Sequence, residues 1–132
     1  MISSFALALI AAVVVLQIAI FSSSIYLHRC LTHRAAKLHP VVALFFRMMV
    51  WITTGLVAKQ WVAVHRKHHA FPDVEGDPHS PHVAGFWSIQ LGNVVHYARE
   101  AHKPEVVEKY AKDIHDDAWD RYLFNHGKAA NL

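Results

Sequence analysis

Residues 5–21 read FALALIAAVVVLQIAIF, an apolar run that only Gln17 interrupts. No charged side chain occurs in residues 1–27. An α-helix rises 1.5 Å per residue, so this stretch is long enough to cross a hydrocarbon core of roughly 30 Å. The sequence therefore predicts a transmembrane helix over residues 1–27.

A secretory signal peptide is the alternative for the same run, because the serines at 22–24 are small residues at a plausible cleavage position. Such a peptide needs cationic residues before its apolar core, and here the first one, Arg29, follows the core. We therefore favour the transmembrane helix. By the positive-inside rule, Arg29, Arg34 and Lys37 place its C-terminal end in the cytoplasm.

Charge is unevenly distributed along this chain of 132 residues. All 10 acidic residues follow position 72, whereas the first 69 residues contain lysine and arginine but no carboxylate. A basic segment between apolar runs suits the anionic face of a membrane and argues against nucleic acid as a partner. The single cysteine, Cys30, excludes a disulfide within the chain and a cysteine-based zinc site.

Histidine is over-represented, with 12 residues, and two clusters carry the chemistry. In His65-Arg-Lys-His68-His69, positions i, i+3 and i+4 fall within about 100° around a helix, so three imidazoles are expected on one face. In His28-Arg-Cys-Leu-Thr-His33, the i, i+5 spacing puts two rings about 140° apart on an ideal α-helix. Neutral imidazole binds iron, zinc or copper, so we predict a metal site. The first pair is expected to flank two ions or to reach different ions. The alternative is a basic surface for lipid headgroups.

A second apolar segment runs over residues 40–64, with Pro40 suited to a first helical position and His39 as its expected cap. It is long enough to span, but a span would put the two clusters on opposite faces of the membrane. Because we expect them to share a metal centre, we predict an interfacial or re-entrant amphipathic helix that returns to the same face, with Arg47 and Lys59 reaching headgroups.

The rest of the chain is expected to be a solvated loop followed by a helical tail. Asp73, Glu75 and Asp77 resemble an acidic cation site, but we favour a solvated loop for them. His79 and His82 are expected on the surface or the substrate side rather than as ligands. An interfacial amphipathic stretch is expected at 84–97. The predicted class is thus an all-α membrane protein made of a transmembrane helix (1–27), the first histidine cluster (28–39), the interfacial helix (40–64), the second cluster (65–69), and a cytoplasmic loop with a helical tail (70–132).

These clusters resemble the first two of the three histidine boxes of membrane fatty-acid desaturases. The surrounding WITTGLVAKQWVAVHRKHHAFPDVEGDPHSPHVAGFW is similar to bacterial members of the acyl-CoA, Δ9 stearoyl-type branch. The HxxxxH spacing of the first box favours desaturases over the related hydroxylases. The resemblance implies a single partial desaturase domain over 1–132, with iron ligands at His28, His33, His65, His68 and His69.

The resemblance also implies a non-haem di-iron centre, O2 as co-substrate, and electrons from a ferredoxin or a cytochrome b5-like protein. The implied reaction introduces a cis double bond into a fatty acyl-CoA or another acyl-lipid, at the cytoplasmic face of a bacterial inner membrane. The chain departs from the family in two ways. The third box is absent from these residues, and Gln60 stands where many relatives have an acidic residue. We therefore expect an incomplete chain that is inactive alone. A membrane fatty-acid or alkane hydroxylase and a non-catalytic metal-binding remnant remain as alternatives, and a bis-histidine haem site is a weaker one.

Overall fold

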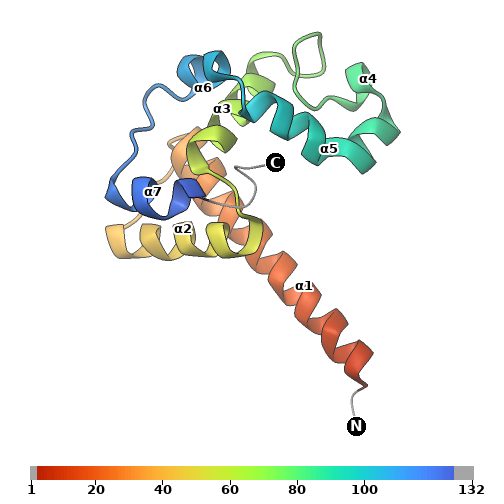
Figure 1. Ribbon diagram of the computed structural model, residues 1–132, viewed down its shortest axis with the longest axis vertical. Coiled ribbons are helices and arrows are strands. Elements are labelled where there is room, and N and C mark those ends of the chain that lie inside the picture. Colours follow the sequence, from red (N-terminus) through yellow and green to blue (C-terminus); the bar gives the residue numbers. More distant parts are fainter. Residues whose placement is uncertain (1–2, 127–132) are drawn as a thin grey trace. The chain divides into compact units, whose positions relative to one another are not determined.

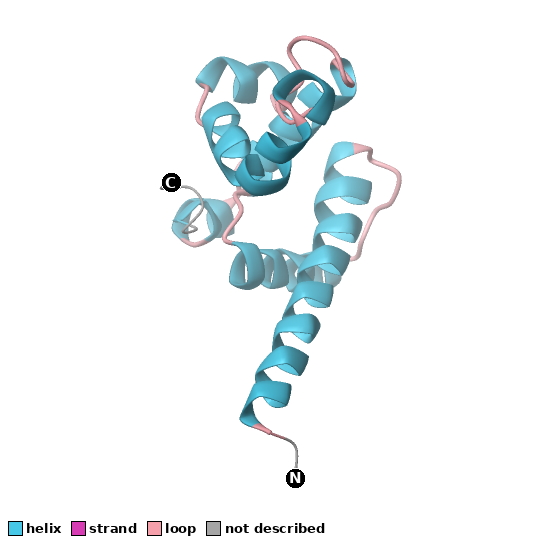
Figure 2. Ribbon diagram, turned by 90° about the vertical axis from the view of Figure 1, so that its right-hand side faces the viewer, coloured by secondary structure: helices cyan, strands magenta, loops and turns pink. Residues whose placement is uncertain are grey.

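The computed structural model describes residues 3–126, and every regular element in that range is a helix (Figure 1) (Figure 2). The predicted all-α class is confirmed. The outer ends of the expected transmembrane helix (1–2) and tail (127–132) lie outside the described residues. The helices are α1 (Ser4–Ser22), the π-helix η1 (Ser23–Thr32), α2 (Pro40–Thr54), α3 (Ala58–Ala70), α4 (Pro81–Ala84), α5 (Phe86–Ala101), α6 (Pro104–Tyr110), α7 (Ala118–Tyr122) and the 3₁₀-helix η2 (Phe124–His126).

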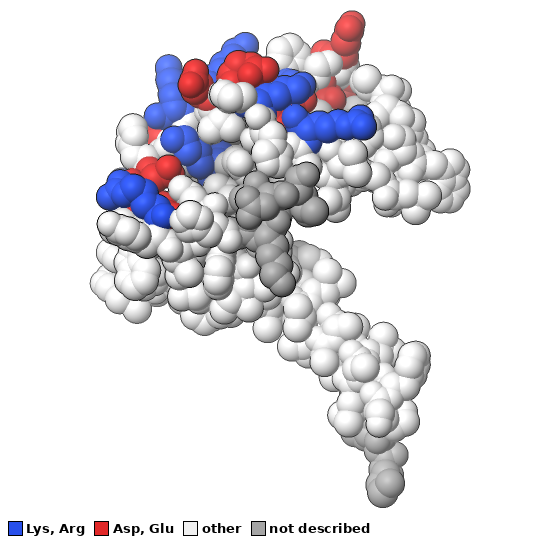
Figure 3. Space-filling view, in the orientation of Figure 1, with Lys and Arg blue, Asp and Glu red and all other residues white. Residues whose placement is uncertain are grey.

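The helices form two compact units that divide after Gly55. In the first, the Ser3 hydroxyl accepts the N–H of Ala6 at 3.2 Å and starts α1. The helical stretch Ser4–Thr32, 29 residues long, is the one continuous helix among the described residues that is long and apolar enough to cross a membrane. Large side chains such as Leu9 and Leu16 are more than half exposed, which suits contact with lipid. Only uncharged atoms are visible along α1 in Figure 3.

Helix α2 packs against α1 and η1 in the same unit. The rings of Phe21 and Phe46 lie 5.9 Å apart, and Leu27 and Val50 are buried. The expected cap is confirmed, because the Nδ1 of His39 accepts the N–H of Val41 at 3.4 Å.

A left-handed residue interrupts the second apolar segment. Gly55 has φ 67° and donates its N–H to the carbonyl of Trp51 at 3.0 Å, which ends α2. A new helix, α3, starts at Ala58. The single helix expected over residues 40–64 is therefore two helices, and the second of them carries the second histidine box.

In the second unit, α3 lies against α5 and α6 and buries Val62, Ala63 and Val64. Two of its cationic residues, Arg66 and Lys67, bind the tail. Arg66 donates to the carbonyl of Tyr110 at 2.9 Å and pairs with Asp113. The Nζ of Lys67 lies 2.8 Å from the Oε1 of Glu100.

The tail is thus packed on the box helix, whereas the sequence predicted a wholly solvated segment. Ala101, Val106 and Ala111 are buried. Glu100 is also buried, and burial by itself raises its pKa. The hydrogen bonds from Lys67 and Lys103 outweigh that effect, so the pKa of Glu100 lies below its ordinary value. Figure 3 shows acidic and basic side chains intermixed on the face that carries α6.

Replacing Gly55 and Gly92 by alanine should have opposite effects on stability. Gly55→Ala places a Cβ at a left-handed residue, which costs about 1–2 kcal/mol. Gly92→Ala lies inside α5, where the new Cβ meets only the His96 ring at 3.9 Å, and should stabilise by about 0.5–1 kcal/mol. Chemical unfolding in detergent, followed by far-UV circular dichroism, measures both. If both variants change the free energy of unfolding in the same direction, the helix break at Gly55 is contradicted.

Candidate metal centre

The first histidine box lies at the end of the π-helix η1, with His28 inside it and His33 as its C-cap, and carbonyls of this helix accept hydrogen bonds from residues five positions later. The N–H of His33 donates to the carbonyl of His28 at 3.0 Å. The two rings stand 4.5 Å apart with an interplanar angle of 65°. The expected separation of about 140° is therefore wrong, because it assumed an α-helix. In a π-helix, residues five apart come onto the same side.

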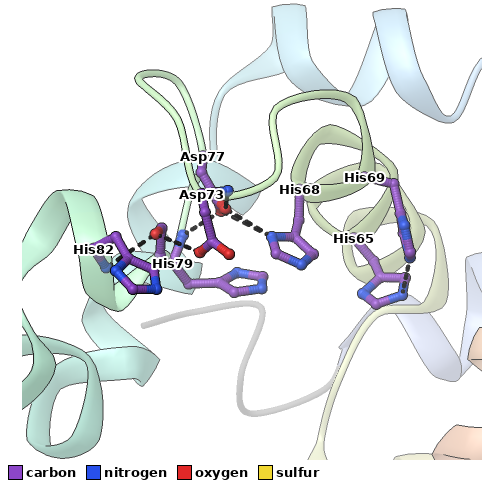
Figure 4. Close-up of polar contacts among 8 residues, drawn as sticks. His65, His68, His69, Asp73, Asp77, His79 and His82 are labelled. Atoms are coloured by element: carbon purple, nitrogen blue, oxygen red, sulfur yellow. Dashed lines mark hydrogen bonds and ion pairs between the residues drawn. The ribbon is translucent and has the colours of Figure 1, made fainter.

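The second box lies on α3 with its three imidazoles on one side of the helix, as the spacing predicted (Figure 4). The ring centres lie 4.7 Å apart for His65–His69, 5.6 Å for His68–His69 and 6.2 Å for His65–His68. The Nε2 atoms of His65 and His69 are 3.1 Å apart. Two imidazole nitrogens at the usual bond length from one ion, with a right angle between them, would be about 3.0 Å apart.

Trp61 lies one turn before His65 on α3 and stacks on its ring. The ring centres are 4.6 Å apart and the planes differ by 18°. The structure shows Trp61 in contact with a box histidine, where it shields one face of that imidazole from water.

Asp77 is a buried carboxylate at the centre of the loop that follows α3, with a side chain 0% exposed. Its oxygens accept the backbone N–H of Asp73 at 2.9 Å and of His79 at 3.0 Å. The Nδ1 of His68 lies 2.9 and 3.0 Å from the two oxygens (Figure 4). The expectation that Asp77 lies in solvent is therefore wrong, because the loop folds back onto α3 and closes around it.

These contacts fix the proton of His68. Burial by itself raises the pKa of Asp77, but the hydrogen bonds from His79, Asp73 and His68 outweigh it, so the pKa lies below its ordinary value. An ionised carboxylate only accepts hydrogen bonds, so the Nδ1 of His68 is the donor, and in the neutral imidazole the Nε2 then keeps the lone pair. A carboxylate that orients a histidine in this way is the usual outer partner of a metal-binding imidazole.

His79 stacks on His68, with ring centres 4.6 Å apart and planes 25° apart. Burial, and next the neighbouring His68, lower the pKa of His79 below its ordinary value. Ligand atoms of His68, Asp77 and His79 lie within 4.8 Å of one another. However, lone pairs in two nearly parallel rings do not converge on one ion. His79 therefore packs beside the box in this arrangement. The sequence pattern did not predict that its ring lies next to His68.

His82 is exposed, and its N–H donates to the hydroxyl of Ser80 at 3.1 Å, which starts α4. The Ser80 hydroxyl in turn donates to Asp73 at 2.7 Å. His82 thus lies on the surface, as expected, and its backbone belongs to the hydrogen-bonded loop around Asp77.

A cavity of about 340 Å³ opens beside the second box. Its walls are mostly apolar, and the hydroxyl of Tyr97 is buried there with no hydrogen-bond partner among residues 3–126. Burial raises the pKa of Tyr97, so this phenol stays neutral. The lining residues are Leu56, Trp61, Val64, His65, His79, Asn93, Val94 and Tyr97.

Homologues of this chain are fatty acid desaturases. The icosanoyl-CoA 5-desaturase of Limnanthes douglasii is 35% identical over 96 residues, which are 73% of this chain and 27% of that protein. The sn-1 stearoyl-lipid 9-desaturase of Synechocystis sp. is 29% identical over 75% of this chain and 30% of its own length. A hex-5-enoyl-[acyl-carrier protein] acetylenase of Moorena producens is 30% identical over 65% of this chain and 33% of its own.

The chain thus spans about a quarter to a third of the length of these relatives. No protein-family model and no solved structure matches it.

Asp77→Asn should change the tautomer of His68. An amide can donate to Nδ1, which moves the proton to Nε2 and removes the lone pair there, so metal affinity should fall by about 10- to 100-fold. Nitrogen-15 NMR of labelled histidine reports the tautomer, and metal titration reports the affinity. Glu75→Gln, an exposed carboxylate of the same loop, is the matched control and should change neither. An Nδ1-protonated His68 in Asp77→Asn would contradict the assignment.

Proposed function

We propose that this chain is part of a membrane fatty-acid desaturase and contributes histidine ligands to a di-iron centre. The ligands are His28, His33, His65, His68 and His69. One observation carries the proposal. The buried carboxylate of Asp77 lies 2.9 Å from the Nδ1 of His68, which shares a helix face with two further imidazoles. The similarity to acyl-CoA and acyl-lipid desaturases supports the same assignment.

The side chains present fit iron. Imidazole is a suitable ligand for it, and each box brings its histidines close together on one helix. In the second box, the 3.1 Å between the Nε2 atoms of His65 and His69 matches two neighbouring positions on one ion. In the first box, the π-helix brings His28 and His33 to 4.5 Å between ring centres. Asp77 supplies a carboxylate beside the second box, where Gln60 on the same helix has none.

Such a centre, when bound, supplies the oxidising power that unactivated C–H bonds require, with O2 and two electrons. The chain's own residues prepare the site. Asp77 fixes the proton of His68 at Nδ1, and Trp61 covers one face of His65. Val64, Val94 and Leu56 line the neighbouring cavity with apolar surface, which suits a methylene chain.

The substrate we propose is a fatty acyl chain on CoA or another lipid, and the product is the same chain with a cis double bond. The relatives described above include an acyl-CoA desaturase and an acyl-lipid desaturase, so either carrier fits. A ferredoxin or a cytochrome b5-like protein would deliver the electrons.

For the topology, we propose that Ser4–Thr32 crosses a bacterial inner membrane with the boxes at the cytoplasmic face. Arg29, Arg34 and Lys37 at the end of this helix support that orientation. A shared centre also requires the chain from α2 to α3 to return to the same face. The break at Gly55 supports a re-entrant path, because a straight helix over 40–64 would cross instead.

Expression in a desaturase-deficient bacterium of the full-length protein that contains this chain tests the proposal. Mass spectrometry of the lipids should show fatty acids two hydrogens lighter. Loss of an outer partner of a metal ligand typically lowers activity about 10- to 100-fold. His65→Ala removes a ligand itself, so the yield of this product should fall by more than that. His126→Ala, at an exposed histidine of η2, is the matched control and should leave the product unchanged.

Two outcomes of the same experiment contradict the proposal in different ways. Fatty acids that gain one oxygen would identify a hydroxylase. Unchanged lipids together with a purified protein that holds no iron would indicate a non-catalytic membrane protein.

A further inference from the structure

The helix that carries the first box changes its hydrogen-bonding pattern from α to π between Ser22 and Ser23 and keeps the π pattern for 10 residues. π-helices are rare and usually one turn long, and they occur frequently at functional sites. Here the wider pattern coincides with the box. Residues five apart, which an α-helix would separate by about 140°, come together.

One buried side chain closes this segment. The Oγ1 of Thr32 donates to the carbonyl of Leu27 at 2.9 Å, five residues back. The N–H of the next residue, His33, donates to the carbonyl of His28 with the same offset at 3.0 Å. Thr32 is 8% exposed and Leu27 is 0% exposed, so this bond is shielded from water.

A second threonine in the same unit makes the corresponding side-chain hydrogen bond within an α-helix. The Oγ1 of Thr53 donates to the carbonyl of Met49 at 2.6 Å, four residues back, within α2. The two threonines thus make the same kind of bond with different offsets. The offset of five at Thr32 matches the π pattern at the C-terminal end of η1.

We propose that Thr32 is a positioning residue that holds the π-helix at its C-terminal end, so that His28 and His33 bind one metal ion as a pair. Leu27 and Thr32 face the interior of the unit, while His33 is exposed and His28 partly so, which leaves the imidazoles accessible to an ion. The inference rests on the proposed function, since that function makes both histidines ligands. It assigns a role to Thr32, which touches no metal, and it explains why His28 and His33 are five residues apart.

The test uses Cu²⁺ as the probe, because imidazole binds it strongly and electron paramagnetic resonance counts coordinated nitrogens. The full 132-residue chain in lipid nanodiscs, with His65→Ala, His68→Ala and His69→Ala to silence the second box, is the parent. We expect one Cu²⁺ with two nitrogens from His28 and His33. Thr32→Val keeps the shape but removes the donor, and should weaken binding by about tenfold and reduce the signal to one nitrogen.

Two further variants separate positioning from general damage. Thr32→Ser keeps a hydroxyl and should restore the two-nitrogen signal with an affinity near that of the parent. Thr53→Val removes the α-type bond in α2 and should leave the signal unchanged.

The outcomes distinguish the inference from the proposed function. If the parent binds Cu²⁺ through two histidines and Thr32→Val does so equally well, the positioning role is wrong while the ligand assignment stands. If the parent shows no two-nitrogen site, the ligand assignment itself fails, and the inference with it. Equal losses in Thr32→Val and Thr53→Val would also contradict a specific role for Thr32.

Discussion

The buried carboxylate of Asp77 is the interaction on which the second box and the loop after it both depend. A buried charge is costly unless hydrogen bonds compensate it, and here the backbone of Asp73 and His79 and the ring of His68 supply those bonds. The loop must therefore fold back onto α3, because its own amides complete the shell around the carboxylate. The same bonds fix the orientation and the tautomer of His68 and bring His79 to stack against it.

The residues between the box histidines also have a structural role. Arg66 and Lys67 lie between His65 and His68 in the sequence and bind Asp113 and Glu100 of the tail. The histidines of α3 are thus available to bind a metal, while Arg66 and Lys67 hold the helix against the tail. A helix with three histidines and few apolar residues near its end has little hydrophobic surface to hold it. Its attachment by partly buried ion pairs explains why the tail packs closely on it.

Periodicity predicted the parts that follow from regular helical geometry. The shared face of the second box follows from the i, i+3, i+4 spacing, and the start of α2 at Pro40 with its His39 cap follows from local sequence. The π-helix could not be predicted this way, because HxxxxH has no special meaning until the hydrogen-bond offset is known. Likewise, Gly55 is one of several glycines, and only its positive φ shows that it ends a helix. Asp77 was misjudged because a proline-rich acidic loop usually lies in solvent, although its position soon after a histidine box was a signal for an outer-shell carboxylate.

Every role assigned to the two boxes requires that these histidines bind iron. X-ray absorption at the iron K-edge, on the chain loaded with Fe²⁺ without oxygen, tests it directly. If these histidines bind iron, the spectrum shows a first shell of nitrogen and oxygen with the outer-shell scattering of imidazole rings, and this scattering weakens when His65 and His69 are both replaced by alanine. Iron surrounded by oxygen alone, with no imidazole scattering, would contradict it.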